Sequence, residues 1–509
     1  MSIELTKTDI GTAEVLYDNF AEQGIDCDIS LPDYCPDIMR ILRCSVTNSI
    51  TNSKISGDRA TVDGNAKIRI VYADDKNGIY CYEQDYPFSK FSELPQTYDG
   101  AVLCSSAKTE YANCRAVSKK RIDIHGVVSI RFKIVGIKNE SVITDAEGDG
   151  IQLRKKKIGT DSVAAVVMKK FQLSQTEEAD GGEIGKIFYA CASPVLSETK
   201  IIKGKILLKG EAVLKVMYCS ATGENESVCV NYNLPFSEII DIESIDDSCK
   251  VSVGFNVDQV QAEPKTDNDG EYKYLNLGCD ICAVVTAYRT EDICVITDSY
   301  STQKEIDAKY KTETFTQILQ NLNDSIICRE SVDLSSMNPQ RIYAAIAQSP
   351  EAKSRFDADK MTVTGKIPLK FILIDGEGTP TFCEREAEFE YSRSIDAKGG
   401  NLYCDPKLFL TGYSCTLTSD GRAEFKAEMN ISADITETSE CRTLVSLKTV
   451  ENSELKKRHS SLVICFCNGG EKIWDIARKY NTTVEDIMSE NELTSDEIGE
   501  KMMLMIPVK

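Results

Sequence analysis

Histidine is almost absent from this sequence of 509 residues, with His125 and His459 as the only two. Catalytic triads and cysteine–histidine pairs need an imidazole base, so any such site would have to use one of them. His125 stands between Ile124 and Gly126 in an alternating stretch, which places it on the polar face of a strand. The chain also lacks the glycine-rich patterns Gly-x4-Gly-Lys-(Ser/Thr) and Gly-x-Gly-x2-Gly that cradle phosphates. We therefore expect no catalytic residues, no bound cofactor and no enzymatic activity.

Long apolar segments are also missing, and the 59 basic residues are outnumbered by 80 acidic ones. No run of about eighteen apolar residues occurs, so we expect no segment that spans a membrane. Residues 1–6, Met-Ser-Ile-Glu-Leu-Thr, lack the basic and apolar regions of a signal peptide, which predicts a cytoplasmic protein. The formal net charge of −21 disfavours nucleic acid and anionic membranes as partners, because both repel such a surface.

Cysteine, in contrast, is abundant, with twenty residues. In a cytoplasmic chain these are expected to be reduced thiols that pack as small hydrophobic side chains. Cys279 and Cys282 lie three apart on a predicted strand and so point to opposite faces. Cys465 and Cys467 could share a strand face, but His459 is the only other candidate ligand nearby, which leaves a zinc site incomplete. We expect no metal centre.

Two basic clusters stand out against the acidity: Lys119–Arg121 and Arg154–Lys157. They fit two interpretations. Either they are solvent-exposed strand ends and linkers, or they form an electrostatic docking site for an acidic partner such as another copy of this chain.

Three stretches of the chain resemble one another. Each has a glycine inside an alternating, strand-like run, at Gly64, Gly210 and Gly365, and a Tyr, Tyr or Leu eight residues later. The glycines are about 150 residues apart, so the repeating unit is the size of a whole domain. The strand that follows in each copy ends in a matching motif: Pro87-Phe88-Ser89, Pro235-Phe236-Ser237 and Glu390-Tyr391-Ser392.

Alternation of apolar and polar residues dominates each copy, as in Arg121–Val135, and predicts sheets with one buried face. Short helices are expected near the start of each copy, at Ala13–Gln23, Asp161–Leu173 and Thr314–Asn323. We therefore predict a mainly β, multidomain fold: three antiparallel β-rich, sandwich-like domains with short helices, then a small α+β (βααβ) domain. The predicted boundaries are 1–150, 151–305, 306–455 and 460–509.

The first copy carries the motifs that point to a family. They are Leu31-Pro32, Pro36-Asp37-Ile38, Ile41-Leu42, the glycine-centred strand that ends in Val71-Tyr72, and Pro87-Phe88-Ser89. With them the repeats resemble the SPOCS domain, a β-rich module found in proteins of bacterial endospore formation. The resemblance covers most of residues 1–450 and is weakest in the third copy, where Leu373 replaces the tyrosine.

The last fifty residues, 460–509, are organised differently. A short apolar strand, Leu462–Cys467, is followed by an Asn-Gly-Gly turn, two helical segments and a closing strand, Leu504–Pro507. One face of the first helix is expected to carry Ile473, Ile476, Ala477 and Tyr480. Thr482 and Glu485 have the spacing of a capping box for the second helix.

This β-α-α-β order, with the chain's only tryptophan near its centre, resembles a LysM domain. The residues that match the LysM pattern are Gly470, Trp474, Ile476, Ala477, Tyr480, Thr483, Val484, Glu485, Ile487, Asn491, Ile506 and Pro507. LysM domains usually bind N-acetylglucosamine-containing glycans between the loop after the first strand and the loop before the last. Here Glu471-Lys472 replaces Asp-Thr in one loop, and Glu500-Lys501-Met502 replaces a Pro-Gly-Gln-like turn in the other. Bulky charged side chains where a sugar approaches the backbone predict weak or absent glycan binding.

The same module favours a protein partner. A strand buries only alternate residues, so in Met502-Met503-Leu504-Met505 two methionines are expected to be exposed, or covered by the third repeat. Methionine-rich surfaces suit protein docking. The predicted protein-binding residues are Glu471, Lys472, Ile473, Trp474, Glu500, Lys501, Met502, Met503 and Met505.

SPOCS-like repeats followed by one LysM domain resemble the clostridial spore-coat morphogenetic proteins. The resemblance implies a non-enzymatic adaptor of the mother-cell cytoplasm that gathers on the forespore surface and in the spore coat. It implies that the LysM module binds the coat's morphogenetic ATPase, stage IV sporulation protein A, with further copies of itself or other coat proteins as additional partners. The alternative is LysM-mediated binding of peptidoglycan or another GlcNAc-containing glycan. The sequence leaves open the roles of the repeats, the oligomeric state and the LysM face that binds.

Overall fold

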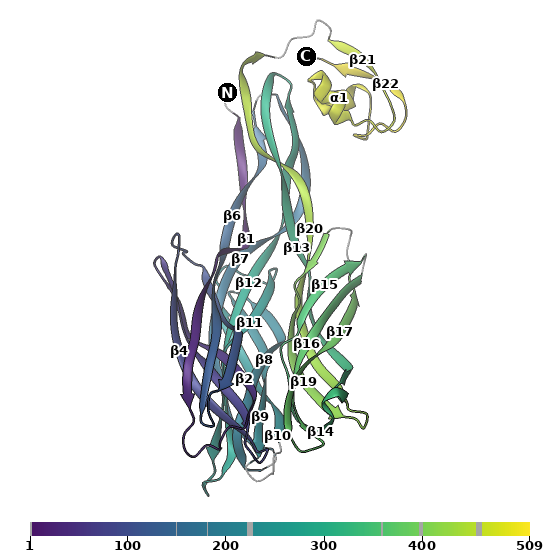
Figure 1. Ribbon diagram of the computed structural model, residues 1–509. Coiled ribbons are helices and arrows are strands. Elements are labelled where there is room, and N and C mark those ends of the chain that lie inside the picture. The colour runs from purple at the N-terminus through teal and green to yellow at the C-terminus, as the bar shows by residue number, and fades with distance from the viewer. Residues whose placement is uncertain are drawn as a thin grey trace.

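A computed structural model describes residues 3–148, 150–180, 182–220, 227–357, 360–396, 401–454 and 461–508. Antiparallel strands form three repeats, and a small module with two helices and two strands follows them (Figure 1). The predicted mainly β fold with a C-terminal α+β module is confirmed. The predicted boundary between residues 455 and 460 lies outside the described residues.

The elements run in chain order through the repeats. Repeat 1 comprises β1 (Glu4–Ser30), β2 (Arg40–Ser56), β3 (Arg59–Ala73), β4 (Ile79–Glu93), β5 (Val102–Ala116) and β6 (Arg121–Glu147). Repeat 2 comprises β7 (Ile151–Glu178), β8 (Ile184–Ile202), β9 (Lys205–Ser220), β10 (Ser227–Asp241), β11 (Lys250–Thr266) and β12 (Tyr272–Ser301). Repeat 3 comprises β13 (Lys304–Asp333), a 3-10 helix (Ser335–Met337), β14 (Pro339–Ala347), β15 (Glu351–Asp357), β16 (Lys360–Asp375), β17 (Pro380–Ser394), β18 (Asn401–Cys404), β19 (Lys407–Leu417) and β20 (Arg422–Glu454). The C-terminal module comprises β21 (Leu462–Cys467), α1 (Ile473–Tyr480), α2 (Val484–Glu490) and β22 (Met502–Pro507).

Each repeat is a sandwich of two antiparallel sheets. In repeat 1 the strand orders are β1-β6-β5 and β2-β3-β4, and repeat 2 has the corresponding orders β7-β12-β11 and β10-β9-β8. In repeat 3 two of the outer strands are interrupted, so that β14 and β15 both pair with β16, and β18 and β19 both pair with β20. Because side chains alternate between the faces of a strand, each pair of sheets encloses its own apolar core.

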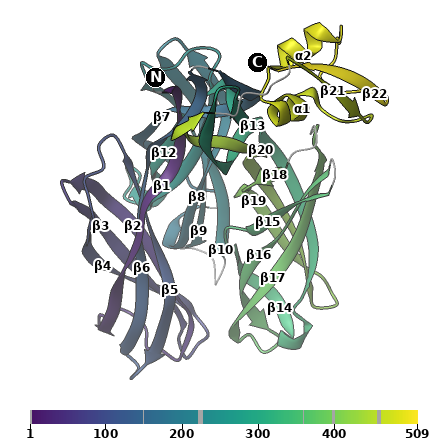
Figure 2. The ribbon, with the colours of Figure 1, turned by 90° about the horizontal axis from the view of Figure 1, so that it is seen from above.

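The first and last strands of each repeat are longer than its sandwich and continue into a shared stem (Figure 1). Glu4–Val15 of β1 pair with the second half of β6, and the same arrangement joins β7 to β12 and β13 to β20. The three two-stranded ribbons bury apolar residues of all three repeats against one another, among them Val142, Val295 and Phe315. Figure 2 shows the three lobes that meet at this stem.

Each ribbon leaves its sandwich at a β-bulge. The register shifts between Val15 and Tyr17 in β1, between Val163 and Ala165 in β7, and between Ile318 and Gln320 in β13. A bulge inserts one extra residue, bends the strand and increases its twist. The three bulges therefore mark the points where the strands change from packing within a lobe to packing in the stem.

These bulges also explain an incorrect prediction. The three segments expected to be helical are strands instead: Ala13–Gln23 in β1, Asp161–Leu173 in β7 and Thr314–Asn323 in β13. The extra residue moves the inward-facing positions from one set of alternate residues to the other. Buried residues then recur at helix-like intervals, as Phe315, Ile318 and Leu322 do, although the backbone is extended.

The glycine that marks each repeat lies opposite a phenylalanine on the neighbouring strand. The pairs are Gly64 with Phe88, Gly210 with Phe236, and Gly365 with Phe389. A Cβ added to Gly210 would lie 2.6 Å from the Phe236 ring and would also collide with a carbonyl oxygen of β8, so only glycine leaves room for the ring. The repeat motif of the third copy is therefore centred on Phe389, and its predicted alignment on Tyr391 is wrong by two residues.

Candidate functional site

The C-terminal module forms a compact unit around a small apolar core. β21 and β22 pair along their whole length, from Leu462 opposite Pro507 to Cys467 opposite Met502. The two helices cover one face of this hairpin, and Ile473 of α1, Ile487 of α2 and Leu504 of β22 are fully buried in the core. In α2 the cap is Thr483, whose hydroxyl accepts a hydrogen bond from the Asp486 N–H at 3.0 Å, one residue later than the predicted Thr482–Glu485 pair.

The other face of the hairpin has no cover among the described residues. Its side chains form what we name the apolar strip, which consists of Leu462, Ile464, Phe466, Met503 and Met505, with exposed fractions of 42%, 57%, 74%, 53% and 39%. Phe466 lies opposite Met503, and Ile464 lies opposite Met505, so the five side chains form one continuous surface. Contiguous exposed apolar surface of this kind marks interaction sites on soluble proteins.

The methionine pattern follows the alternation predicted from the sequence. Met503 and Met505 point to solvent while Leu504 is buried between them. Met502 is half-buried at the edge of the module's core. Sequence reasoning missed the other half of the strip, on β21. Leu462–Cys467 is apolar at every position, and since only one face of a strand can enter a core, that run was the available signal.

The loops that flank the helices hold the remaining predicted binding residues. The Glu471 carboxylate accepts hydrogen bonds from the backbone N–H and the side-chain amide of Asn468. Lys472, Glu500 and Lys501 are exposed, whereas Ile473 is fully buried and supports the core instead of a surface. Among the predicted residues, Ile473 is therefore part of the core. The charged residues lie on exposed loops, and Met503 and Met505 belong to the apolar strip.

The two loops where LysM domains take a glycan are tied to each other. The Gly470 N–H donates to the Ile498 carbonyl, the Ile498 N–H donates to the Glu471 carbonyl, and the Ile473 N–H donates to the Asp496 carbonyl. These backbone donors are satisfied within the module, so they are not free to bind a sugar. A Cβ on Gly469 would lie 2.9 Å from the Gly499 carbonyl oxygen, which shows how closely the loops approach.

Trp474 lies on a third surface of the module, which packs against the end of β12 in the stem. Its indole Nε1 donates to Asp298 at 2.9 Å, and its ring meets the Tyr300 ring edge-on with centroids 4.9 Å apart. The Tyr300 hydroxyl donates to the Thr482 carbonyl at 2.7 Å, and Arg478 forms an ion pair with Asp298 at 2.8 Å. We name this contact the stem face of the module. It occupies Trp474, and Met503 and Met505 do not belong to the apolar cluster that includes Tyr300.

The basic clusters are paired within the chain. Lys119 and Lys120 each lie 3.5 Å from Asp37, and Arg121 forms an ion pair with Asp28. In the second cluster Lys155 pairs with Asp145 at 2.8 Å and Lys157 with Asp292 at 2.9 Å. Most of these cations already have carboxylate partners, which weakens the hypothesis of an acidic docking partner.

Nothing in the described residues forms a recognisable catalytic or metal centre. His125 lies on an exposed strand face between Asp26 and Asp123, and hydrogen bonds to both carboxylates raise its pKa. Cys465 and Cys467 share a face, with their sulfur atoms 3.6 Å apart, but His459 lies outside the described residues. Cys279 and Cys282 are both buried, and burial raises the pKa of each thiol to about 12. No group of three potential metal ligands is found in the described part of the chain.

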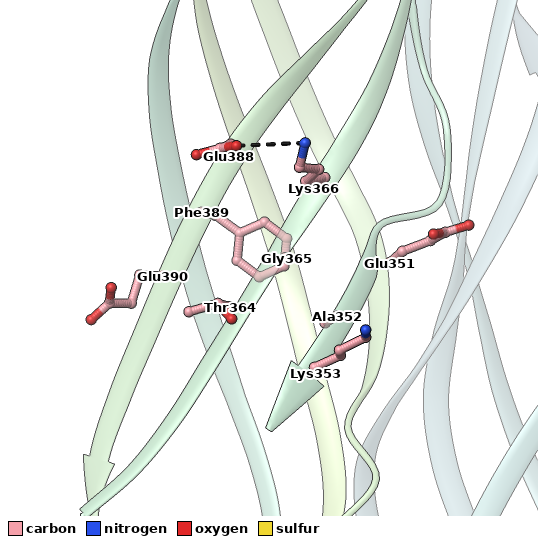
Figure 3. A pocket seen from close by; sticks show the side chains of 9 residues that line it. All are labelled: Glu351, Ala352, Lys353, Thr364, Gly365, Lys366, Glu388, Phe389 and Glu390. Carbon is pink, nitrogen blue, oxygen red and sulfur yellow. Dashed lines mark ion pairs between the residues drawn. The ribbon is translucent and has the colours of Figure 1, made fainter. Parts of the chain in front are cut away.

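One hollow of about 770 Å³ opens in repeat 3, beside the glycine–phenylalanine pair of β16 and β17 (Figure 3). Phe389 lies across Gly365 at its centre, and Lys366 pairs with Glu386 at 2.7 Å and lies 3.6 Å from Glu388. Its lining residues include no histidine or cysteine. With Lys366 already paired and no histidine or cysteine in the lining, this hollow shows no recognisable catalytic constellation.

Comparison with family models agrees with this architecture. The SipL, SPOCS domain model matches residues 37–117 and 183–265, and the LysM domain model matches residues 470–507. This chain carries SPOCS and LysM domains. These matches support a sporulation coat-related protein with a C-terminal LysM module, and both families are non-catalytic binding or adaptor domains.

The first SPOCS segment covers β2 to β5 of repeat 1, and the second covers β8 to β11 of repeat 2. A search of curated proteins and a search of solved structures gave no match. Within the described residues, neither helix is long and apolar enough to cross a membrane.

Proposed function

We propose that this chain is a non-enzymatic adaptor of spore-coat assembly, and that its LysM module binds a protein partner through the apolar strip. The observation that supports this most directly is the five exposed apolar side chains on the outer face of β21 and β22. Methionine and phenylalanine on such a face offer adaptable, polarisable contact area. Burial of this face on a partner would remove it from water, which is favourable at roughly 25 cal/mol per Å².

The proposed partner is the coat's morphogenetic ATPase, stage IV sporulation protein A. In this proposal the protein works in the mother-cell cytoplasm and gathers on the forespore surface. The units 1–150, 151–305 and 306–455 serve as a scaffold, and 460–509 is the docking module. The stem contact through Tyr300 and Asp298 supports this division, because it holds the module in one orientation with the strip turned outward.

Glycan binding by the module is proposed to be weak or absent. The support is the set of hydrogen bonds between the two loops, which use the backbone donors of Gly470, Ile473 and Ile498. The charged side chains of Lys472, Glu500 and Lys501 also stand at this edge. A sugar would have to break these contacts and displace these side chains before it reached the backbone.

The test is a binding titration of the ATPase against the full chain. Met503→Glu puts a charge in the strip and is expected to weaken binding at least about tenfold. Ile327→Glu is the matched control, because Ile327 on β13 has a similar exposed fraction of 59% but lies in repeat 3. Circular dichroism should show both variants folded. Retention of the chain on purified peptidoglycan with no measurable ATPase binding would contradict the proposal and favour the glycan alternative.

A further inference from the structure

The centre of the molecule is an apolar core shared by the three repeats, which we name the junction core. Val71, Met217 and Ile372 each lie seven residues after the glycine of their repeat, and all three are buried there together. Corresponding strands β3, β9 and β16 therefore face one another across this core. Residues two positions earlier or later on these strands point to the same face, so they also face the junction core or its edge.

Three basic residues occupy one such position, five residues after the glycine: Arg69, Lys215 and Lys370. In repeats 1 and 3 the residue directly opposite is a glutamate, and it forms an ion pair with the cation. The pairs are Arg69 with Glu83 and, at 3.0 Å, Lys370 with Glu384.

In repeat 2 the opposite residue is Asn231, so Lys215 lacks the carboxylate that its counterparts have. Lys215 is 4% exposed, and among the described residues its ammonium has only the ring of Tyr413, with the centroid 3.2 Å away. Burial lowers its pKa, as expected for a cation without a counter-ion.

A second buried cation, Arg43 of repeat 1, lies in the same region. It is 8% exposed, and its Nε and Nη1 atoms have no hydrogen-bond partner among the described residues. Its guanidinium lies 5.9 Å from the ring centroid of Tyr189 on β8. Two residues further along β8, Cys191 lies opposite Lys215. Arg43 and Lys215 thus approach neighbouring parts of one strand, with Tyr413 from repeat 3 beside them.

Buried cations without a counter-ion are unfavourable, and arginine cannot escape the cost by losing its proton. The neighbouring carboxylates are already used, since Glu83 pairs with Arg69 and Glu384 pairs with Lys370. The chain as a whole carries a net charge of −21, yet its centre has two cations in excess. An anion from solution would supply the missing negative charge and accept hydrogen bonds from the unpaired N–H groups of Arg43.

We propose that the junction binds one small oxyanion of the phosphate or sulfate class, held by the Arg43 guanidinium with Lys215 as the second positive charge. Arginine and lysine are the usual ligands of such anions, because both are donors that carry charge. Each repeat contributes one residue to this site: Arg43 from repeat 1, Lys215 from repeat 2 and Tyr413 from repeat 3. The bound anion would therefore join the lobes at the centre of the scaffold, independently of the docking role proposed for the LysM module.

Thermal unfolding of the full chain tests this proposal, with inorganic phosphate compared against chloride at the same pH and ionic strength. Phosphate well above its Kd should raise the Tm by about 2 °C or more, because it binds only the folded state. Arg43→Met and Lys215→Met should each lose this shift. In chloride, Arg43→Met should be at least as stable as the unvaried chain, because it removes a buried charge without a partner.

Lys370→Met is the matched control, since Lys370 holds the equivalent position in repeat 3 but has its own glutamate. It should keep the full phosphate shift. Equal shifts in all four proteins, or no shift in the unvaried chain together with no heat of phosphate binding in calorimetry, would overturn the proposal. The second outcome would mean that water alone satisfies Arg43. If Arg43→Met does not fold, Lys215→Met and its control decide the question.

Discussion

Two faces of the LysM module differ in how they are completed. The stem face is satisfied within the chain, because Trp474 and Arg478 share Asp298, and Tyr300 packs edge-on against Trp474. The apolar strip has no such partner, and Phe466 alone is 74% exposed. A single module thus presents one face fitted to its own scaffold and another whose burial requires a second molecule. The difference indicates that the tryptophan fixes the module's position and the strip faces outward.

The largest effect should come from removing the aromatic ring of the strip. Phe466→Ser should reduce affinity for the ATPase by about 2 kcal/mol, roughly thirtyfold, because large aromatic anchors dominate interfaces. Stability should change little, since the side chain is exposed in the free protein. A binding titration checks affinity, and thermal unfolding checks the fold. Val445→Ser, at an exposed apolar site on β20, is the control and should bind normally.

Removal of the central contact on the stem face should have the next largest effect. Tyr300→Ala deletes the ring that meets Trp474 and the hydrogen bond to Thr482. It should weaken docking of the module by about 1–2 kcal/mol, the sum of one aromatic pair and one hydrogen bond. Trp474 is the only tryptophan in the chain, so its fluorescence emission reports this contact directly and should shift to the red. Tyr272→Ala, at an exposed tyrosine on the same strand, should leave the emission unchanged.

A smaller loss is expected when the stem face keeps its shape but loses its charge. In Asp298→Asn the side-chain oxygen can still accept from the Trp474 indole, but the ion pair with Arg478 is gone. Arg478 is about half exposed, so the pair contributes only about 0.5–1 kcal/mol. When unfolding in urea is followed by the emission of Trp474, the midpoint of the transition should fall slightly. Asp292→Asn, which breaks the exposed pair with Lys157, should not move that midpoint.

Added salt should have the smallest effect, and it should weaken the stem face but not the apolar strip. Raising the ionic strength from about 0.1 to 1 M shortens the Debye length from roughly 10 to 3 Å and screens the Arg478–Asp298 pair. Docking on the stem should weaken by less than about 0.5 kcal/mol, whereas binding through the apolar strip should hold. A fall of more than tenfold in ATPase affinity over this range would mean that charged side chains dominate the partner interface.

The sequence predicts local features of this structure better than long-range ones. Alternation predicts the sheets and the exposure of Met503 and Met505, because both depend only on the two-residue period of a strand. The same rule fails at the bulges, because one extra residue interrupts the two-residue period. Those segments were therefore wrongly predicted to be helical. The stem face could not be predicted, because Trp474 and Asp298 are 176 residues apart and no local pattern links them.

The repeats show a similar limit. Gly64, Gly210 and Gly365 are visible in the sequence as a repeated motif, but their reason is not. Only the strand register shows that each faces a phenylalanine, which places the third motif on Phe389. The junction was equally hidden, because Arg43 and Lys215 approach the same part of β8 only when separate lobes pack together.

Hydrogen–deuterium exchange of the full chain, alone and with the ATPase bound, tests the central claim most directly. Binding through the apolar strip should slow exchange in Leu462–Cys467 and Met502–Pro507, which carry the strip. Exchange should not change in Ile473–Tyr480 or at Asp298 and Tyr300, because the stem face stays closed. Protection of α1 and faster exchange at the end of β12, with the strip unchanged, would contradict binding through the strip.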